Sequence, residues 1–221
     1  MEITEAHAMS LRLAQAESQK LTYTPSNMTW SSAMAQAAVL SDSDLKRVLR
    51  YCQSRRHAVR DATVVLFSLH TGLRAKELAA LEWCDVFDSD ARVRERFTLR
   101  AAQTKGQRAR AVFINTQLRA QLERYRSLQR RFEAHAPLFA SQHGRAFSAN
   151  TMCQLFLNIY KGCGLEQCSS HSGRRTFITR LANNGVGVRA LAELAGHSSI
   201  SVTQRYIDVN DEQLARAVEL I

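Results

Sequence analysis

The chain has 221 residues, 45% of them hydrophobic, which is enough for one large domain with a sizeable core or for one domain plus a short extension. It carries 30 Lys and Arg against 20 Asp and Glu, a net charge of +10 and a pI near 9.9, so we expect a polyanionic partner, either nucleic acid or an anionic membrane face. No apolar run approaches the roughly 20 residues of a membrane span, and the first residues lack a signal-peptide pattern, so we expect a cytoplasmic protein.

The five cysteines are an odd number without a secreted-type framework, which favours reduced thiols. Cys163, Cys168 and His171 lie close enough in sequence to raise a metal site. No Cys-x-x-Cys pair or second His pair accompanies them, so we expect no metal there.

Residues 1–40 read as a short N-terminal extension and linker, and residues 41–221 as the folded domain with a C-terminal helix. Within the extension, Ile3–Leu21 has a helical composition, and Thr22–Ser32 is rich in Ser, Thr and Pro, as linkers are. Ser41 and Asp44 form a capping-box pattern that predicts a helix start. The helix that follows has apolar residues at helical spacing: Leu45, Val48, Leu49 and Cys52.

A nearly all-apolar stretch, Ala62–Leu69, predicts a buried central helix that ends at Gly72. Arg74–Leu81 then restarts a helix, with Leu78 and Leu81 on one side. Because this second helix follows the glycine directly, its first residue stands at a fixed point of the backbone.

Two short strands, Val93–Ala101 and Ala109–Asn115, are predicted to form a hairpin around a turn at Gln103–Gln107. Four further helices follow: Thr116–Glu133, one capped by Ser148, Ser172–Asn183 with Phe177, Ile178 and Leu181 inward, and Val188–Ala195, which ends at Gly196. Asp211–Ile221 closes the chain as an amphipathic helix. The predicted class is therefore mainly α with a small antiparallel β-sheet.

Tyr206 follows His197 by nine residues, close behind the pair His171 and Arg174, which lie three apart and hence on one helix face. A tyrosine can act as a covalent nucleophile, and arginine and histidine are the side chains that hold and neutralise phosphate oxygens. This combination indicates attack of the tyrosine on a phosphate.

Each of these residues also has a simpler structural explanation when it is taken alone. Arg74 is a salt-bridge partner for Glu77, His197 a C-terminal cap, and Tyr206 a half-buried packing residue. Lys105 is a solvated charge on a turn. The phosphate contacts of the hairpin are then Arg108 and Arg110 rather than Lys105.

Taken together and in order, these residues resemble the tyrosine recombinases of the phage integrase family. The resemblance covers about residues 40–210, and its motifs are TGLRAKEL with Arg74, TKGQRAR with Lys105, HSGR with His171 and Arg174, LAGH with His197, and TQRYI with Tyr206. It implies the DNA breaking-rejoining catalytic fold and a site-specific recombinase that uses a 3′-phosphotyrosyl intermediate and Holliday-junction strand exchange.

The resemblance also implies a role for each residue at the phosphate. Arg74 and Arg174 would grip the non-bridging oxygens of the scissile phosphate, and His197 would hydrogen-bond to it. Glu77 would orient Arg74 as a supporting partner.

The proton transfers and the nucleophile are implied in the same way. Tyr206 would attack phosphorus and leave a free 5′-hydroxyl. Tyrosine hydroxyls have an ordinary pKa of about 10, so a proton acceptor is needed, and His171 is the family's acceptor. Lys105 would be the general acid for the 5′-oxygen. The ester conserves the bond energy, so no cofactor is expected, neither metal nor ATP.

Double-stranded DNA is the implied partner, with four protomers on two sites, weakly associated without DNA. Expected contacts to the DNA backbone are Lys76, Arg108, Arg110, Arg175 and Arg205. Only some 40 residues precede the capping box, so the chain resembles the minimal, fimbrial-invertase-like members, and an accessory DNA-binding protein is a further expected partner. Two alternatives remain: a type IB topoisomerase-like activity, and a non-enzymatic DNA-binding protein with this fold.

Overall fold

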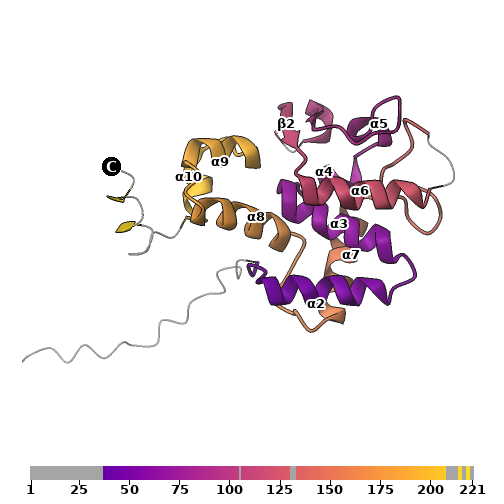
Figure 1. The fold of residues 1–221 in the computed structure, drawn as a ribbon, viewed down its shortest axis with the longest axis horizontal. Helices are drawn as coiled ribbons and strands as arrows, with labels where there is room; N and C mark the ends of the chain where they lie inside the picture. Colours follow the sequence, from indigo (N-terminus) through magenta and orange to yellow (C-terminus); the bar gives the residue numbers. More distant parts are fainter. Residues whose placement is uncertain (1–36, 105, 130–132, 208–213, 216–217, 220–221) are drawn as a thin grey trace, which may run out of the picture. The chain divides into compact units, whose positions relative to one another are not determined.

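Figure 1 shows the computed structural model, which describes residues 37–207 except 105 and 130–132, together with 214, 215, 218 and 219. The expected class is confirmed, because helices dominate and one two-stranded antiparallel sheet accompanies them. The helices are α2 (Asp42–Gln53), α3 (Ala58–Thr71), α4 (Ala75–Ala79), α5 (Trp83–Val86), α6 (Thr116–Ser127), α7 (Ala149–Gly162), α8 (Ser172–Asn183), α9 (Val188–Ala195) and α10 (Ile200–Gln204). The strands are β1 (Arg96–Leu99) and β2 (Arg110–Phe113), with a 3-10 helix, η1 (Ala101–Gln103), after β1.

The helix ends that local signals predicted are confirmed. Ser41 caps α2 in a capping box with Asp44, and Ser148 caps α7 through the Thr151 N–H. Helix α3 ends at Gly72 and α9 at Gly196, both in the left-handed conformation that glycine adopts without strain. The two glycine ends fix where the chain turns before α4 and before α10.

The hairpin is shorter than expected. Strand β1 pairs with β2 from Arg96 opposite Phe113 to Leu99 opposite Arg110, and the chain beyond β1 winds into η1 instead of continuing the strand. The side chain of Gln103 causes this turn: its Oε1 accepts the Arg100 N–H, and its amide donates to the Ala80 carbonyl. At this position a hydrogen bond from the Arg100 backbone N–H to the Gln103 side chain thus takes the place of a hydrogen bond between the strands.

Helix α6 ends at Ser127 rather than at Glu133. Leu128 is 60% exposed and so buries little apolar surface at this point, and a guanidinium N–H of Arg126 donates to the carbonyl of Gln129. The buried face of the helix is otherwise as expected from its spacing: Leu118, Leu122 and Tyr125.

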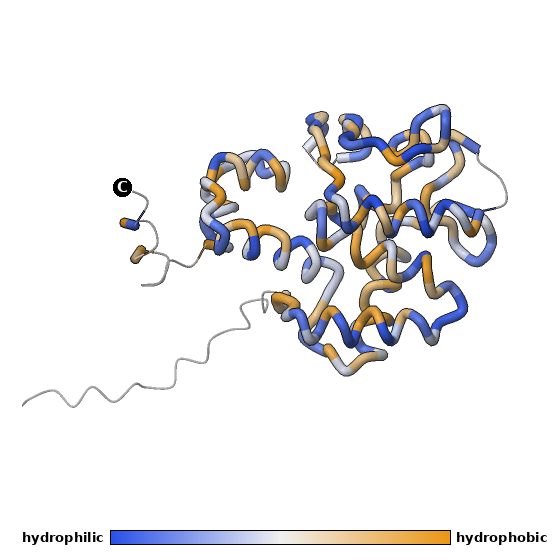
Figure 2. Tube along the Cα trace, in the orientation of Figure 1, coloured by the Kyte–Doolittle hydropathy of each residue, from blue (hydrophilic) through white to orange (hydrophobic). Residues whose placement is uncertain are grey.

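Figure 2 shows apolar residues concentrated along α3 and α7 in the middle of the fold. Val64, Val65 and Phe67 of α3 are fully buried, as are Phe156 and Ile159 of α7. Both helices belong to one hydrophobic cluster, which includes residues of the hairpin and of α6. The hairpin and α4, which line the cleft described below, are packed against this core.

Helix α8 packs directly on α3. A Cβ at Gly173 would lie 2.5 Å from Ser68 Oγ, and one at Gly72 would lie 2.6 Å from Phe177 Cδ1, so the two backbones can approach only because these positions are glycines. The expected inward face of α8 is partly wrong, because Ile178 is buried whereas Phe177 and Leu181 are only half-buried. The first half of α8 is buried instead: Ser172, Gly173, Arg174 and Thr176.

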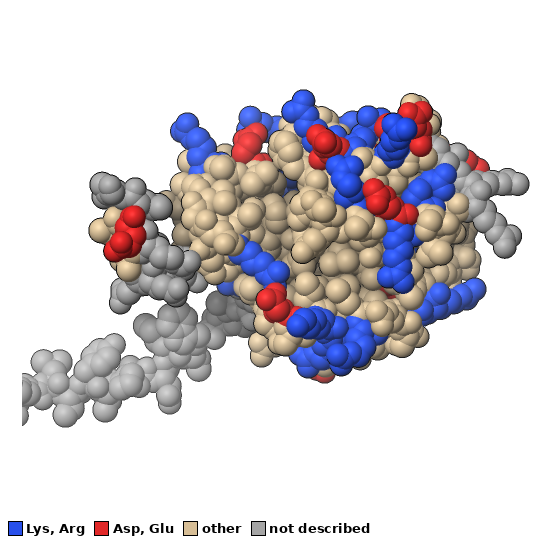
Figure 3. Space-filling model, in the orientation of Figure 1, with Lys and Arg blue, Asp and Glu red and all other residues tan. Residues whose placement is uncertain are grey.

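On the face shown in Figure 3, Lys and Arg side chains are spread over several elements rather than gathered in one tail. No described helix combines the length and apolar character needed to cross a membrane. The helix and linker expected within residues 1–32 lie outside the described residues, as does most of the segment Asp211–Ile221.

Candidate active site

A cleft of about 440 Å³ lies where the N-terminus of α4, the hairpin and the C-terminal end of α9 meet. Arg74, Arg110 and His197 line it, so three motifs that are far apart in the sequence converge here. The short loop after α9 brings His197 to this place, because Gly196 turns the chain at the end of the helix. The other lining residues are Glu77, Thr104, Gly106, Arg108, Ala109, Glu193, Gly196, Ser198 and Val202.

Glu77 is completely buried and holds two of the cations in this cleft. Its Oε1 lies 3.0 Å from Arg74 NH1, and its Oε2 lies 2.9 Å from Arg110 NH2. Oε2 also accepts the backbone N–H of Arg74 at 2.8 Å, which closes the first turn of α4. One carboxylate therefore fixes both the position and the direction of Arg74.

Arg174 is only 4% exposed, and its side-chain hydrogen bonds within the described part of the chain go to backbone carbonyls. Its NH1 donates to the Gly72 carbonyl and its NH2 to the Ala195 carbonyl, each at 2.7 Å. Burial, followed by the nearby positive charge of Arg74, lowers the pKa of Arg174 to about 9. The guanidinium is thus still charged at neutral pH but poorly solvated, a state that an anion in the cleft would relieve.

His197 and Tyr206 lie side by side, and the charge of Arg174 acts on the His197 ring. Their rings stack with centroids 5.9 Å apart, and His197 Nδ1 is 2.7 Å from the hydroxyl oxygen of Thr203 in α10. Burial lowers the pKa of His197 to about 4, and the charges of Arg174 and Arg74 act in the same direction. At neutral pH this imidazole is therefore uncharged and able to donate one N–H.

The arrangement suits one phosphate group. Two guanidiniums can bind its oxygens, a neutral imidazole can donate to it, and Tyr206 is close enough to Arg174 to interact with its charge. Arg74 additionally lies 3.5 Å from the Gly196 carbonyl, next to His197. The set can therefore stabilise negative charge next to a tyrosine hydroxyl.

A family model described as the phage integrase family matches residues 38–213, the span that contains every one of these residues. The chain belongs to the phage integrase family. Tyrosine recombinase XerC of Myxococcus xanthus is 30% identical over 190 residues, which cover 82% of this chain and 58% of that protein. The chain thus spans less than three fifths of the length of that curated relative.

Two solved structures share the fold. The crystal structure of XerA recombinase matches with a TM-score of 0.66 and 24% identity, covering 90% of this chain and 66% of that one. XerH site-specific recombinase, bound to palindromic difH substrate in a post-cleavage complex, matches with a TM-score of 0.60 and 21% identity, covering 81% of this chain and 51% of that one. The phage integrase family fold expected from the sequence is therefore confirmed.

Of the six expected catalytic residues, Arg74 and His197 line the cleft. Arg174 and Tyr206 do not line it but lie next to these two: Arg174 bonds to the Ala195 carbonyl near His197, and the Tyr206 ring stacks on His197. His171 is exposed at the start of α8 and is not among the residues that line the cleft. Lys105 lies outside the described residues, although its neighbours Thr104 and Gly106 line the cleft.

The expected DNA contacts fall into two groups. Lys76, Arg108 and Arg205 are exposed, as a backbone-phosphate contact requires. Arg110 belongs to the buried cluster around Glu77, and Arg175 donates to the Ala37 carbonyl at 3.1 Å. These last two side chains therefore have partners within the fold.

Sequence reasoning missed two kinds of site residue in this family member. Thr203 was not considered, and only its place six residues after His197 could have suggested it. The carbonyls of Gly72 and Ala195, which hold Arg174, carry no signal in the sequence, because any residue offers a carbonyl.

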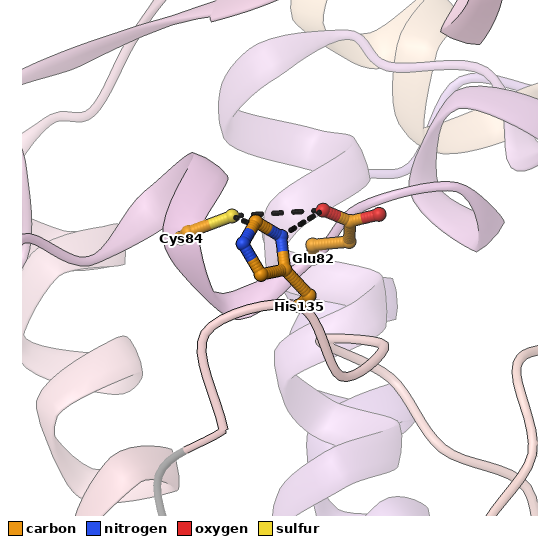
Figure 4. A group of neighbouring side chains, drawn as sticks. All are labelled: Glu82, Cys84 and His135. Atoms are coloured by element: carbon orange, nitrogen blue, oxygen red, sulfur yellow. Dashed lines mark hydrogen bonds and ion pairs between the residues drawn. The ribbon is translucent and has the colours of Figure 1, made fainter.

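The metal site considered from the sequence positions of Cys163, Cys168 and His171 is not the group of metal-ligating side chains that the structure brings together. Among the described residues, the His, Cys, Asp and Glu side chains close enough to hold one ion are Glu82, Cys84 and His135 (Figure 4). None of these three lines the cleft.

Proposed function

We propose that this chain is the catalytic part of a site-specific DNA recombinase that cuts and rejoins DNA through a 3′-phosphotyrosyl intermediate, with strand exchange through a Holliday junction. The observation that carries the proposal is that Arg74 and His197 line one cleft, that the buried Arg174 interacts with the charge of Arg74, and that Tyr206 stacks on His197. Membership in the phage integrase family supports it.

In this mechanism, the scissile phosphate enters the cleft and takes the guanidiniums of Arg74 and Arg174 as partners. Both are held in advance, the first by Glu77 and the second by two backbone carbonyls, so little reorganisation is needed as negative charge grows. A phosphate next to His197 opposes the effect of the neighbouring cations and favours an N–H donated to the phosphate oxygen.

Tyr206 attacks phosphorus, and its proton passes to a base; the 5′-oxygen leaves and takes up a proton. We assign these two proton transfers to His171 and Lys105, following the family resemblance. The phosphotyrosyl ester is then attacked by a 5′-hydroxyl of the partner strand, which restores Tyr206. The roles are all filled by side chains of this chain.

The partner we propose is double-stranded DNA, held chiefly through phosphates by Lys76, Arg108 and Arg205. The crystal structure of XerH, which shares the fold, contains that recombinase bound to its palindromic difH substrate. We further propose four protomers on two paired sites, with an accessory DNA-binding protein contributing where the chain itself binds weakly.

The deciding experiment uses a plasmid that carries two copies of the native flanking DNA, with the covalent protein–DNA adduct measured on a denaturing gel. Wild-type protein is expected to form the adduct and to join the two sites. Tyr206→Phe is expected to form no adduct while binding DNA nearly as well, and Tyr51→Phe, a change of the same kind on α2, is expected to retain it.

An adduct with Tyr206→Phe would remove the nucleophile assignment. Relaxation of single circles without joined products would favour the topoisomerase-like alternative. DNA binding by the wild-type protein without any adduct would favour the non-enzymatic one.

A further inference from the structure

Three side chains from two separate segments converge away from the cleft. Glu82 and Cys84 belong to the start of α5, and His135 belongs to the segment that follows α6 (Figure 4). His135 Nδ1 lies 3.3 Å from Glu82 Oε2, Cys84 Sγ lies 3.6 Å from the same oxygen, and Sγ lies 3.7 Å from Nδ1. The three atoms thus form a nearly equilateral triangle.

That triangle has the size of one face of a zinc tetrahedron. With Zn–S of about 2.3 Å and Zn–N or Zn–O of about 2.0–2.2 Å, tetrahedral angles separate neighbouring ligand atoms by roughly 3.3–3.6 Å. The three measured separations match this range within about 0.1 Å, so a cation above the triangle would need almost no movement of its ligands.

The backbone holds the two segments in this register. The Trp83 N–H donates to the Ala136 carbonyl at 3.1 Å, and the Cys84 N–H donates to the Ala134 carbonyl at 2.8 Å, so the two bonds bracket His135. Glu82 also forms an isolated bridge with Pro137. The ligand side chains are therefore placed by main-chain pairing, and not only by their contacts with one another.

We propose that Glu82, Cys84 and His135 form a binding site for a zinc-type divalent cation. The thiolate, imidazole and carboxylate supply the mixed sulfur, nitrogen and oxygen set that suits zinc or cobalt, whereas magnesium and calcium take oxygen ligands only. Binding forms three bonds to the metal and releases the Cys84 thiol proton to solvent. Water completes the fourth position.

One cation already neighbours the site and contacts the same carboxylate oxygen, Glu82 Oε2, that would bind the metal. Arg100 NH2 lies 3.4 Å from Glu82 Oε2 and 3.6 Å from Asp85 Oδ2, and its side chain is 53% exposed. When zinc takes Glu82, Arg100 keeps Asp85 as its partner. The metal would thus join α5 to the segment after α6, adding a link between parts of the chain some fifty residues apart.

The experiment titrates the full chain, freed of metal by a chelator, with Zn²⁺ in competition with a chromophoric chelator, and separately with Co²⁺ as the spectroscopic probe. We expect one Zn²⁺ per chain and, with Co²⁺, a thiolate charge-transfer band with the intense visible bands of tetrahedral cobalt. Cys84→Ser is expected to lose the charge-transfer band, and His135→Ala to weaken Zn²⁺ binding by at least about 10-fold.

Matched controls come from the same chain. Cys153→Ser removes another half-buried thiol, and His143→Ala removes another exposed imidazole; both are expected to bind like the wild type. The His135 side chain is 84% exposed, so its loss leaves the fold intact, which equal melting temperatures of the metal-free proteins will show. A charge-transfer band that persists in Cys84→Ser, or equal Zn²⁺ affinity of His135→Ala and wild type, would overturn the proposal.

Discussion

Replacing Glu77 by Gln is expected to destabilise the protein strongly, although the change keeps the shape of the side chain. Glu77 is the carboxylate that compensates Arg74 and Arg110, and its charge also acts on Arg174, which bonds to backbone carbonyls in the same cluster. With Gln at this position, the three guanidiniums face an uncharged amide whose NH2 group cannot accept a hydrogen bond. The variant therefore leaves buried positive charge uncompensated.

The magnitude follows from the burial of the group. Glu77 is 0% exposed and Arg110 has a side chain only 7% exposed, so solvent screens this pair poorly. Removing one partner of a buried ion pair costs about 3–5 kcal/mol of the free energy of unfolding. For a domain of 150–250 residues, about 2–4 °C of melting temperature corresponds to each kcal/mol, so the melting temperature should fall by roughly 6–20 °C.

Urea denaturation and thermal melting of the DNA-free protein measure this loss. The matched control is Glu193→Gln, which removes the same charge from an exposed residue of the same cleft and should change stability by less than about 0.5 kcal/mol. If Glu77→Gln melted within about 2 °C of the wild type, or shifted no more than Glu193→Gln, the account of this buried cluster would be refuted.

Two other predictions concern pH and salt. The pKa of His197 is about 4 in the folded protein against an ordinary 6.5, so between these pH values the unfolded chain binds more protons than the folded one. The free energy of unfolding should therefore fall as the pH drops from 6.5 to 4. Because part of the ring is reached by solvent, we expect a fall of about 1–2 kcal/mol. His197→Gln should lack this part of the pH dependence in urea titrations, and an unchanged profile would contradict it. For DNA binding, each neutralised phosphate contributes roughly −0.9 to the slope of log K against log salt. If Lys76, Arg108 and Arg205 neutralise three phosphates, the slope should be about −2.7 or steeper. Arg108→Gln should reduce the slope by about 0.9, whereas Arg92→Gln, exposed on the loop before β1, should not; equal slopes for all three proteins would refute the contact.

The sequence by itself determined those helix ends that rest on a local signal, although not the end of α6, and it predicted candidate residues for the site. The capping box at Ser41 and the left-handed turns at Gly72 and Gly196 depend on atoms within a few residues, so short patterns suffice to predict them. The order of five motifs similarly predicted that Arg74 and Tyr206 belong to one site, before any contact was known. Even the short-range pairing of Arg74 with Glu77, three residues apart, was accessible in this way.

What only the tertiary structure decided is which groups surround those residues. Arg110 meets Glu77 across 33 positions, and Arg174 meets the Gly72 carbonyl across 102, through the packing of α8 on α3. Cys84 and His135 are likewise 51 residues apart and meet through main-chain bonds between their segments. Such partners carry no local signal, because the chain's long-range packing, rather than the spacing of residues along it, sets burial, charge and ligand geometry.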